Sequence, residues 1–174
     1  MIKENIRALI TGFLITAMLI LAGCSNFLNY TLKDTVESDN GVTKVEGLKE
    51  KVVVRRDDLG IPLIEAANFD DLAYATGYVM ASDRLAQMVS YSLLGQGRLS
   101  EMAGKLTLDI DMYVRTIGID QAAKRDYEQL SDDLKSRLEA FSEGVNAYID
   151  SHKDRLPLDF KLSGYVPEPW KPIN

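Results

Sequence analysis

Strand-forming segments are scarce in this sequence, and that scarcity limits the folds the chain can adopt. Residues 51–56 (KVVVRR) are rich in β-branched valine, and residues 61–66 (IPLIEA) form a second short apolar run. Residues 57–60 (DDLG) between them favour a turn, so we expect a hairpin, with Pro62 at an edge or a strand start. A lone hairpin is only marginally stable in water. We therefore predict an α+β chain, with an N-terminal strand hairpin and three or so helices, that packs against more protein.

Helical spacing of apolar residues follows the hairpin. Asn68 is placed to cap a helix that continues to about Leu94, where Gly95 and Gly97 end it. Gly77 lies inside this helix and costs about 1 kcal/mol relative to alanine. We therefore expect another backbone to pack closely against Gly77.

Two further helices are predicted. One, less regular and weakened by Gly118, covers residues 112–130. The clearest begins at Ser131, whose hydroxyl can cap the first turn, and it continues with one apolar stripe (Leu134, Leu138, Phe141, Val145, Tyr148 and Ile149). Residues 157–174 hold four of the chain's five prolines, so we expect this segment to be extended and irregular.

The start of the sequence has the pattern of an export signal. Residues 1–7 include Lys3 and Arg7, residues 8–23 are uncharged and mostly aliphatic, and Leu21-Ala22-Gly23-Cys24 matches the bacterial lipobox. We predict a signal peptide over residues 1–23, lipidation of Cys24, a polar spacer over residues 24–47 and a folded part over residues 48–174. The protein would then be exported and held on a membrane, facing the periplasm or the cell exterior. An uncleaved anchor helix is the alternative.

Several functional classes are disfavoured by residue content. The net charge of −6 is modest and spread along the chain, so nucleic-acid binding is not expected. Cys24 is the only cysteine and His152 the only histidine, which disfavours a zinc site or a disulfide within the chain. His152 follows the polar end of the last helix, where a favourable cation is a better interpretation than a catalytic base.

Other short patterns receive structural interpretations. Residues 95–98 (GQGR) predict a helix-ending turn rather than a phosphate loop. Asp109 and Asp111 lack the other ligands of a calcium loop, so we expect a solvated turn. The pair Asp83-Arg84 is interpreted as a structural lock, with Arg98 or Glu101 as possible partners. The sequon at Asn29 carries little meaning for a bacterial-type lipoprotein.

Five motifs occur in an order that resembles the penicillin acylase (penicillin amidase) family. They are VVVRRDDLGIPLIEA at 52–66, GYVMASDRLAQM at 77–88, GRLSE with Gly104 at 97–104, GVNAYI at 144–149 and YVPEPWKP at 165–172. The resemblance covers about residues 46–174. Leu63, Ser82 and Asn174 depart from the usual histidine, glutamine and aspartate of that family.

The resemblance implies an N-terminal-nucleophile hydrolase with an αββα fold, of which this chain is the α-chain part. In that family a precursor is cut into two chains, and the serine that begins the β chain attacks an amide carbonyl with its own amino group as base. The serine, the calcium site and the acyl pocket all lie downstream, so we assign no catalytic, cofactor-binding or metal-binding residue here. Expected partners are the β-chain part of the precursor, a small-molecule amide such as a β-lactam or an acyl-homoserine lactone, and the membrane.

Two alternatives accompany this interpretation. Gly23-Cys24-Ser25-Asn26 is similar to the β-chain start, but an acylated amino group at Cys24 could not act as a base. We therefore reject Cys24 as a nucleophile, and we expect the chain alone to be inactive and poorly folded. The main rival is a non-catalytic, truncated lipoprotein that acts as a scaffold or binding partner, and a membrane-anchored structural protein unrelated to acylases is the third possibility.

Overall fold

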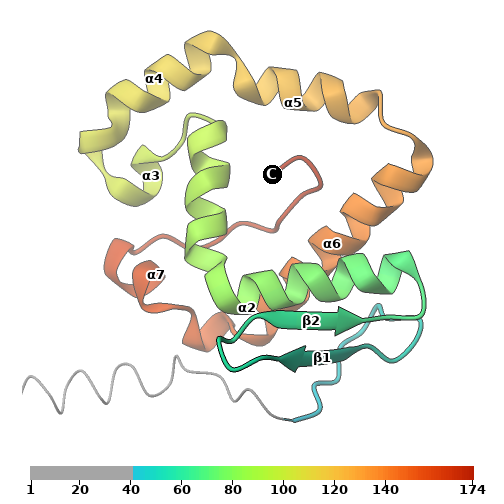
Figure 1. The fold of residues 1–174 in the computed structure, drawn as a ribbon. Helices are drawn as coiled ribbons and strands as arrows, with labels where there is room; N and C mark the ends of the chain where they lie inside the picture. The colour runs from blue at the N-terminus through green and yellow to red at the C-terminus, as the bar shows by residue number, and fades with distance from the viewer. Residues whose placement is uncertain (1–40) are drawn as a thin grey trace, which may run out of the picture. The chain divides into compact units, whose positions relative to one another are not determined.

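The structure, a computed structural model, describes residues 41–174. The predictions for the signal peptide, Cys24, Asn29 and most of the spacer lie outside the described residues. Within them, a two-stranded sheet is followed by a series of helices, and an extended segment ends the chain (Figure 1). None of the helices in residues 41–174 has the length and apolar character needed to cross a membrane.

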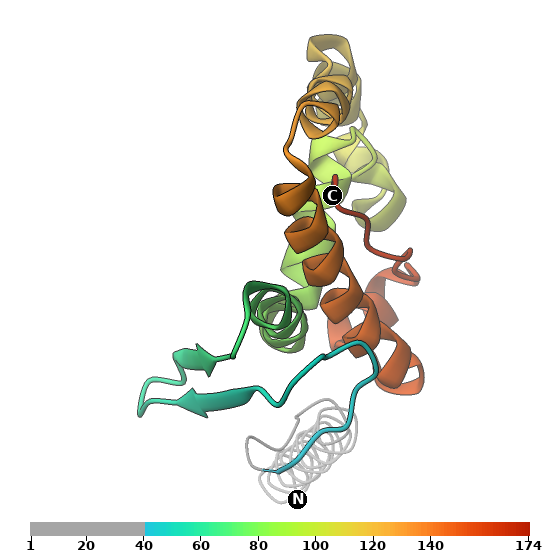
Figure 2. The ribbon, with the colours of Figure 1, turned by 90° about the vertical axis from the view of Figure 1, so that its right-hand side faces the viewer.

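The predicted hairpin is confirmed. Strand β1 (Val53–Arg56) pairs antiparallel with β2 (Pro62–Glu65), with Val53 opposite Glu65 and Arg56 opposite Pro62. In the turn, the Asp57 carboxylate accepts hydrogen bonds from the backbone N–H groups of Leu59 and Ile61. The hairpin projects to one side of the helices (Figure 2), and Leu63 on β2 is 59% exposed.

The first long helix, α2 (Phe69–Gly95), begins at the predicted cap. The Asn68 side chain accepts a hydrogen bond from the backbone N–H of Asp71. The sequence does not predict the kink at Arg84, where φ is −145° and ψ is 29°. This break turns the second half of α2 away from the direction of the first (Figure 1).

The last long helix, α6 (Asp132–Ser151), crosses α2 at two glycines. A methyl group on Gly77 would lie 2.1 Å from the Phe141 carbonyl oxygen, and one on Gly144 would lie 1.9 Å from that of Tyr74. The close packing expected at Gly77 is therefore confirmed. The core around this crossing is formed by Ala81, Leu85, Val89, Leu93, Val145, Tyr148, Ile149 and Phe160.

The prediction of a single helix over residues 112–130 is wrong, because two helices form there. Helix α4 (Leu108–Ile117) ends at Gly118, which adopts the left-handed conformation with φ of 76°, and α5 (Ile119–Glu128) starts directly after it. Glycine adopts this conformation without the steric cost of a Cβ atom, so it ends one helix and redirects the next. Together α4 and α5 connect the end of α2 to α6 (Figure 1).

Short helical turns complete the chain. Helix α3 (Ser100–Ala103) and the 3₁₀ turn η1 (Lys105–Thr107) precede α4, and the turn η2 (Lys153–Arg155) follows α6. The segment after Pro157 is not wholly extended, because α7 (Leu158–Ser163) forms there. The stretch between Pro157 and the left-handed Gly164 contains no proline, which leaves room for a short helix. Residues 164–174 then follow the irregular course that the prolines predict.

Candidate functional site

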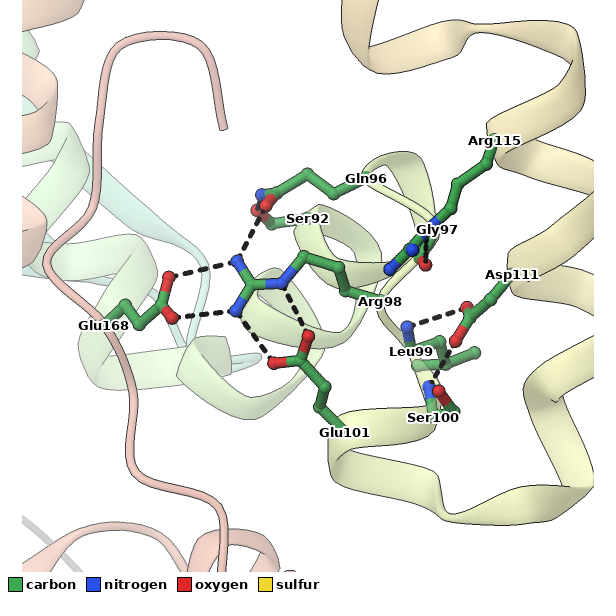
Figure 3. A network of polar contacts seen from close by, with 10 residues as sticks. All are labelled: Ser92, Gln96, Gly97, Arg98, Leu99, Ser100, Glu101, Asp111, Arg115 and Glu168. Atoms are coloured by element: carbon green, nitrogen blue, oxygen red, sulfur yellow. Dashed lines mark hydrogen bonds and ion pairs between the residues drawn. The ribbon is translucent and has the colours of Figure 1, made fainter.

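A network of polar contacts gathers at the junction of α2, α3, α4 and the C-terminal segment (Figure 3). The chain reverses at Gly97, whose φ is 64°. A side chain there would meet the Asp111 carbonyl oxygen at 2.8 Å and the Arg115 side chain at 2.6 Å. The Arg115 Nε atom donates to the Gly97 carbonyl at 2.7 Å. The helix-ending turn predicted for residues 95–98 is confirmed, and its glycine lets α4 approach closely.

Arg98 is the centre of this network and binds two carboxylates. Its Nε and Nη2 atoms donate to the two oxygens of Glu101, each at 2.8 Å. Its Nη2 and Nη1 atoms donate to Glu168 at 2.7 and 3.1 Å, and Nη1 also donates to Gln96 at 3.0 Å. We call Gln96, Arg98, Glu101 and Glu168 the arginine cluster. Because Glu168 lies 70 residues after Arg98, the cluster fixes the C-terminal segment against the end of α2.

The arginine cluster shifts the acid–base properties of its members. Hydrogen bonds to Glu101 and Glu168 raise the pKa of Arg98 above its usual value. The hydrogen bonds from Arg98 hold the pKa values of the Glu101 and Glu168 carboxyls below their usual range. Near neutral pH the cluster therefore holds one cation between two anions.

Asp111 is buried next to this cluster, which corrects the solvated turn expected for Asp109 and Asp111. Both residues lie in α4, and Asp111 is only 4% exposed. Its two oxygens accept hydrogen bonds from the backbone N–H groups of Leu99 and Ser100, each at 2.8 Å. Burial by itself raises the pKa of Asp111, but hydrogen bonds from Ser100 and Leu99 outweigh it, and the pKa is lowered. A carboxylate from α4 thus satisfies the N–H groups at the start of α3.

Asp71 is a second buried carboxylate, at the start of α2, and is 1% exposed. It accepts hydrogen bonds from the backbone N–H groups of Lys49 and Glu50 at 2.8 and 2.9 Å, and from the Asn68 side chain at 2.6 Å. Burial by itself raises the pKa of Asp71, but these hydrogen bonds outweigh it and the pKa is lowered. The carboxyl is therefore anionic at neutral pH. Asp71 therefore ties the segment before β1 to the first turn of α2.

The structural lock proposed for Asp83 and Arg84 has a different partner from those expected. Asp83 pairs with Arg56 of β1 through two contacts, at 2.6 and 3.0 Å, rather than with Arg98 or Glu101. Arg84 donates to Gln87 on its own helix. The expected partners were wrong because the kink at Arg84 and the position of the hairpin are not visible in the sequence.

His152 stands at the C-terminal end of α6, as predicted, but it is buried and not at a solvated helix end. It is 5% exposed, and its ring stacks on Tyr148 with 4.1 Å between the ring centroids. One ring nitrogen lies 2.9 Å from the Tyr148 carbonyl oxygen. In the described part of the chain, His152 is therefore a packed, structural residue.

A hollow of about 440 Å³ lies beside the arginine cluster, between α2, α5, α6 and the C-terminal segment. Its lining is mostly apolar, and it includes Met80, Met88, Tyr91, Phe141, Trp170 and Ile173. The Trp170 backbone is fixed there because its N–H donates to Asn146 at 2.7 Å and its carbonyl accepts from the same side chain at 3.0 Å.

Arg98, Asp71 and Asp111 hold helices and chain segments in place. Their hydrogen bonds join α2 to the C-terminal segment, the segment before β1 to α2, and the start of α3 to α4. Residues 41–174 contain no cluster of side chains suited to a metal ion. Outside the family motifs, the sequence suggested Arg98 and Glu101 only as partners for Asp83-Arg84, and it assigned no contact to Glu168 or to the Asp71 carboxylate. The position of Asp71 was itself a signal, because it stands three residues after the capping residue Asn68, in the first turn of the helix. No local pattern indicates the contact between Arg98 and Glu168.

Replacing Glu168 with glutamine is expected to lower the free energy of unfolding at pH 7 by about 0.5 kcal/mol, since the Glu168 side chain is 58% exposed to solvent. The folded pKa of Glu168 lies below its usual 4.5, so this contribution is present above that value and is lost as the pH falls through the folded value. Thermal unfolding followed by circular dichroism should therefore show a difference at pH 7 that shrinks as the pH falls below 4.5. Glu128→Gln, on the exposed surface of α5, is the matched control. A difference that keeps its full size as the pH is lowered below 4.5 until Glu168 is protonated would contradict this explanation.

The family described as penicillin amidase matches residues 51–174 of this chain. An acyl-homoserine lactone acylase, QuiP, from Pseudomonas aeruginosa is 47% identical over 155 residues, which cover 89% of this chain and 18% of the relative. Penicillin G acylase from Escherichia coli is 32% identical over 133 residues, covering 74% of this chain and 16% of the relative. The chain thus spans less than a fifth of the length of these relatives.

A solved structure has a similar fold over most of this chain. The thermostable penicillin G acylase from Alcaligenes faecalis superposes with a TM-score of 0.64 at 28% sequence identity. The superposition covers 71% of this chain and 67% of the chain it matches.

Proposed function

This chain belongs to the penicillin amidase family, and from that premise we propose that it is the N-terminal portion of an exported acylase-type amidohydrolase. The enzyme would hydrolyse the amide bond between an acyl group and the amine of a small molecule. Its nucleophile would lie on polypeptide downstream of these residues. Cys24 would carry the lipid that holds the enzyme on a membrane, outside the cytoplasm.

The observation that carries the proposal is the family match over residues 51–174, within a chain that spans less than a fifth of its relatives. Helix α4 and the turn before it support the proposal, because they expose large apolar side chains: Leu106, Leu108, Ile110, Met112, Tyr113 and Ile117 are 45–94% exposed. Apolar surface of this extent marks an interaction site. We infer that further polypeptide of the enzyme covers it.

The hairpin supports the same proposal. Strands β1 and β2 pair only with each other among the described residues. A two-stranded sheet of four residues per strand has little stability of its own. We propose that the hairpin belongs to a larger sheet in an αββα fold, which the rest of the enzyme completes.

The proposed substrate class is an N-acylated small molecule with a leaving amine. Relatives named as acyl-homoserine lactone acylases and as penicillin acylases share this chemistry, because both names describe removal of an acyl group from nitrogen. We propose an acyl-homoserine lactone as the first substrate to test, since the relatives with that name reach 47% identity. A penicillin is the second.

A chimeric precursor tests the proposal directly. The corresponding N-terminal segment of the P. aeruginosa acylase is replaced by this chain, and the remainder of the relative is kept. We expect the precursor to be cut into two chains and to hydrolyse an acyl-homoserine lactone that the parent enzyme hydrolyses, while the 174-residue chain alone shows no turnover. Release of homoserine lactone, measured by mass spectrometry, and the two chains on a denaturing gel are the readouts.

Two results would contradict the proposal. A chimera that stays uncut and inactive, beside an active parent enzyme prepared in the same way, would favour a non-catalytic lipoprotein. Clear turnover by the 174-residue chain alone would show that a catalytic site lies within these residues.

A further inference from the structure

We propose that the Lys44–Val45 peptide bond is a processing site, at which a trypsin-like protease cuts the folded part of the protein from its predicted membrane anchor. This inference rests on the proposed function for the lipid at Cys24, which would hold the uncut chain on a membrane. It adds a route by which the folded part leaves that membrane.

The segment before the fold is open to solvent as far as Lys44. Gly41, Val42, Thr43 and Lys44 are all exposed, Val42 to 92%, and residues 41–45 form neither helix nor strand. Proteases cut most readily where the backbone is exposed and carries no secondary structure. The bond after Lys44 therefore lies in a stretch that a protease can reach without unfolding a helix or a strand.

The backbone becomes fixed directly after this stretch. The Tyr74 hydroxyl of α2 donates to the Glu46 carbonyl at 2.7 Å. The buried Asp71 carboxylate then accepts hydrogen bonds from the backbone N–H groups of Lys49 and Glu50 at 2.8 and 2.9 Å. A protease can reach the peptide bonds of this part only after these contacts open, so their cleavage follows the small population of the open form.

Basic residues on both sides of this boundary indicate the class of protease. Between residues 24 and 46 the sequence has two basic residues, Lys33 and Lys44. After the boundary come Lys49, whose N–H is bound by Asp71, and Lys51, which stands just before β1. A protease that cuts after lysine would therefore find an open bond at Lys44 and protected bonds at Lys49 and Lys51. Tenfold protection requires a free energy of local opening of only about 1.4 kcal/mol.

The reaction is the hydrolysis of one amide bond by solvent water. The bond between the Lys44 carbonyl carbon and the Val45 nitrogen breaks, Lys44 gains the new carboxylate and Val45 gains the new amine. The contacts of Tyr74 and Asp71 with the segment all lie after this bond. The released part would therefore keep the hydrogen bonds that attach its first residues to α2.

The test uses the chimeric enzyme, in membranes washed free of soluble protein. A Lys33→Gln background leaves Lys44 as the basic residue between the lipid and the boundary. The membranes are treated with dilute trypsin, the acylase activity released into the supernatant is measured, and the new N-terminus is identified by mass spectrometry. We expect a chain that begins at Val45, formed at least tenfold faster than cuts after Lys49 or Lys51.

Two exposed lysines provide the variant and its matched control. Lys44→Gln should slow the release of activity at least tenfold, because the open bond is no longer a substrate for trypsin. Lys51→Gln removes the same charge on the other side of the boundary and should leave the rate within twofold. Neither side chain has a role in the folded contacts described above, so both variants should keep the activity of the uncut enzyme.

Three results would overturn the inference. Cuts after Lys49 or Lys51 that are as fast as the cut after Lys44 would show that the fold does not protect its own side of the boundary. Degradation at all basic residues at similar rates would show the same. A Lys44–Val45 bond that stays intact while trypsin cuts elsewhere would show that the exposed stretch is not accessible.

The proposed function fails on different results. A chimera that is never cut into its two chains contradicts the proposed function, and the same digestion of the 174-residue chain then decides whether Lys44 is the open site. Acylase activity that is already soluble before trypsin is added contradicts the membrane anchor, while a chain beginning at Val45 would still support the cutting site.

Discussion

Replacing Gly144 with alanine is expected to force α2 and α6 apart and to lower the free energy of unfolding by about 3 kcal/mol, toward the upper end of the cost of overpacking a core. The added methyl group would lie 1.9 Å from the Tyr74 carbonyl oxygen and 3.0 Å from the Tyr78 nitrogen. Both atoms belong to the backbone of α2, so no side-chain rotation relieves the overlap. Since small domains are stable by only about 5–15 kcal/mol, this loss would remove a large fraction of the chain's stability.

Gly95→Ala is the matched control for this substitution. Gly95 is the last residue of α2, and a methyl group there would meet nothing within 4 Å. Alanine favours the helix by up to about 1 kcal/mol over glycine, so this variant should be neutral or slightly more stable. Urea titration of the 174-residue chain, followed by circular dichroism at 222 nm, measures both variants. If Gly144→Ala unfolds at the same urea concentration as Gly95→Ala, the close crossing of α2 and α6 is wrong.

Replacing Asp111 with alanine is expected to cost about 3 kcal/mol, because two hydrogen bonds to a buried charge are lost at once. The N–H groups of Leu99 and Ser100 would remain in a partly buried place without their acceptor. The turn after Gly97 should loosen, and with it the attachment of α4 to the end of α2. Because burial and hydrogen bonding leave the folded pKa of Asp111 below its usual 3.8, its contribution is present at neutral pH and is lost as the pH falls through the folded value.

Asp109→Ala separates this effect from a general loss of negative charge. Asp109 lies in the first turn of the same helix, and it is exposed. Its interaction with the helix dipole accounts for about 0.3–1 kcal/mol. The two variants should therefore differ by about 2 kcal/mol in urea titration at pH 7, and the difference should shrink as the pH falls below 3.8 toward the folded pKa of Asp111. Equal losses at pH 7 would show that the buried carboxylate is not a structural contact.

Much of the helical structure could be predicted because its causes are local. The caps at Asn68 and Ser131 depend on a side chain and a backbone N–H three residues apart. The ends of helices also depend on local glycines. The effect of Gly118 was underestimated, because one helix was expected across it and two form. The helix α7 was missed because four prolines in 18 residues concealed a six-residue stretch without any.

The candidate site was much less predictable, for a physical reason. Asp111 looks like a surface residue in the sequence, and only the chain reversal at Gly97 brings the Leu99 and Ser100 N–H groups to its carboxylate. Arg98 and Glu168 lie 70 residues apart, and no periodicity relates them. The family motifs, by contrast, were readable as a series, and the match to the penicillin amidase family over residues 51–174 confirms that resemblance.

The sequence by itself determined the hairpin, the long helices, their caps and the family, because each depends on contacts within a few residues or on an ordered set of motifs. The tertiary structure decided which carboxylates are buried, what Arg98 binds, where α2 bends and where the chain end lies. These depend on which surfaces meet when distant segments pack, and the free energy of that packing is shared among residues that no local pattern connects.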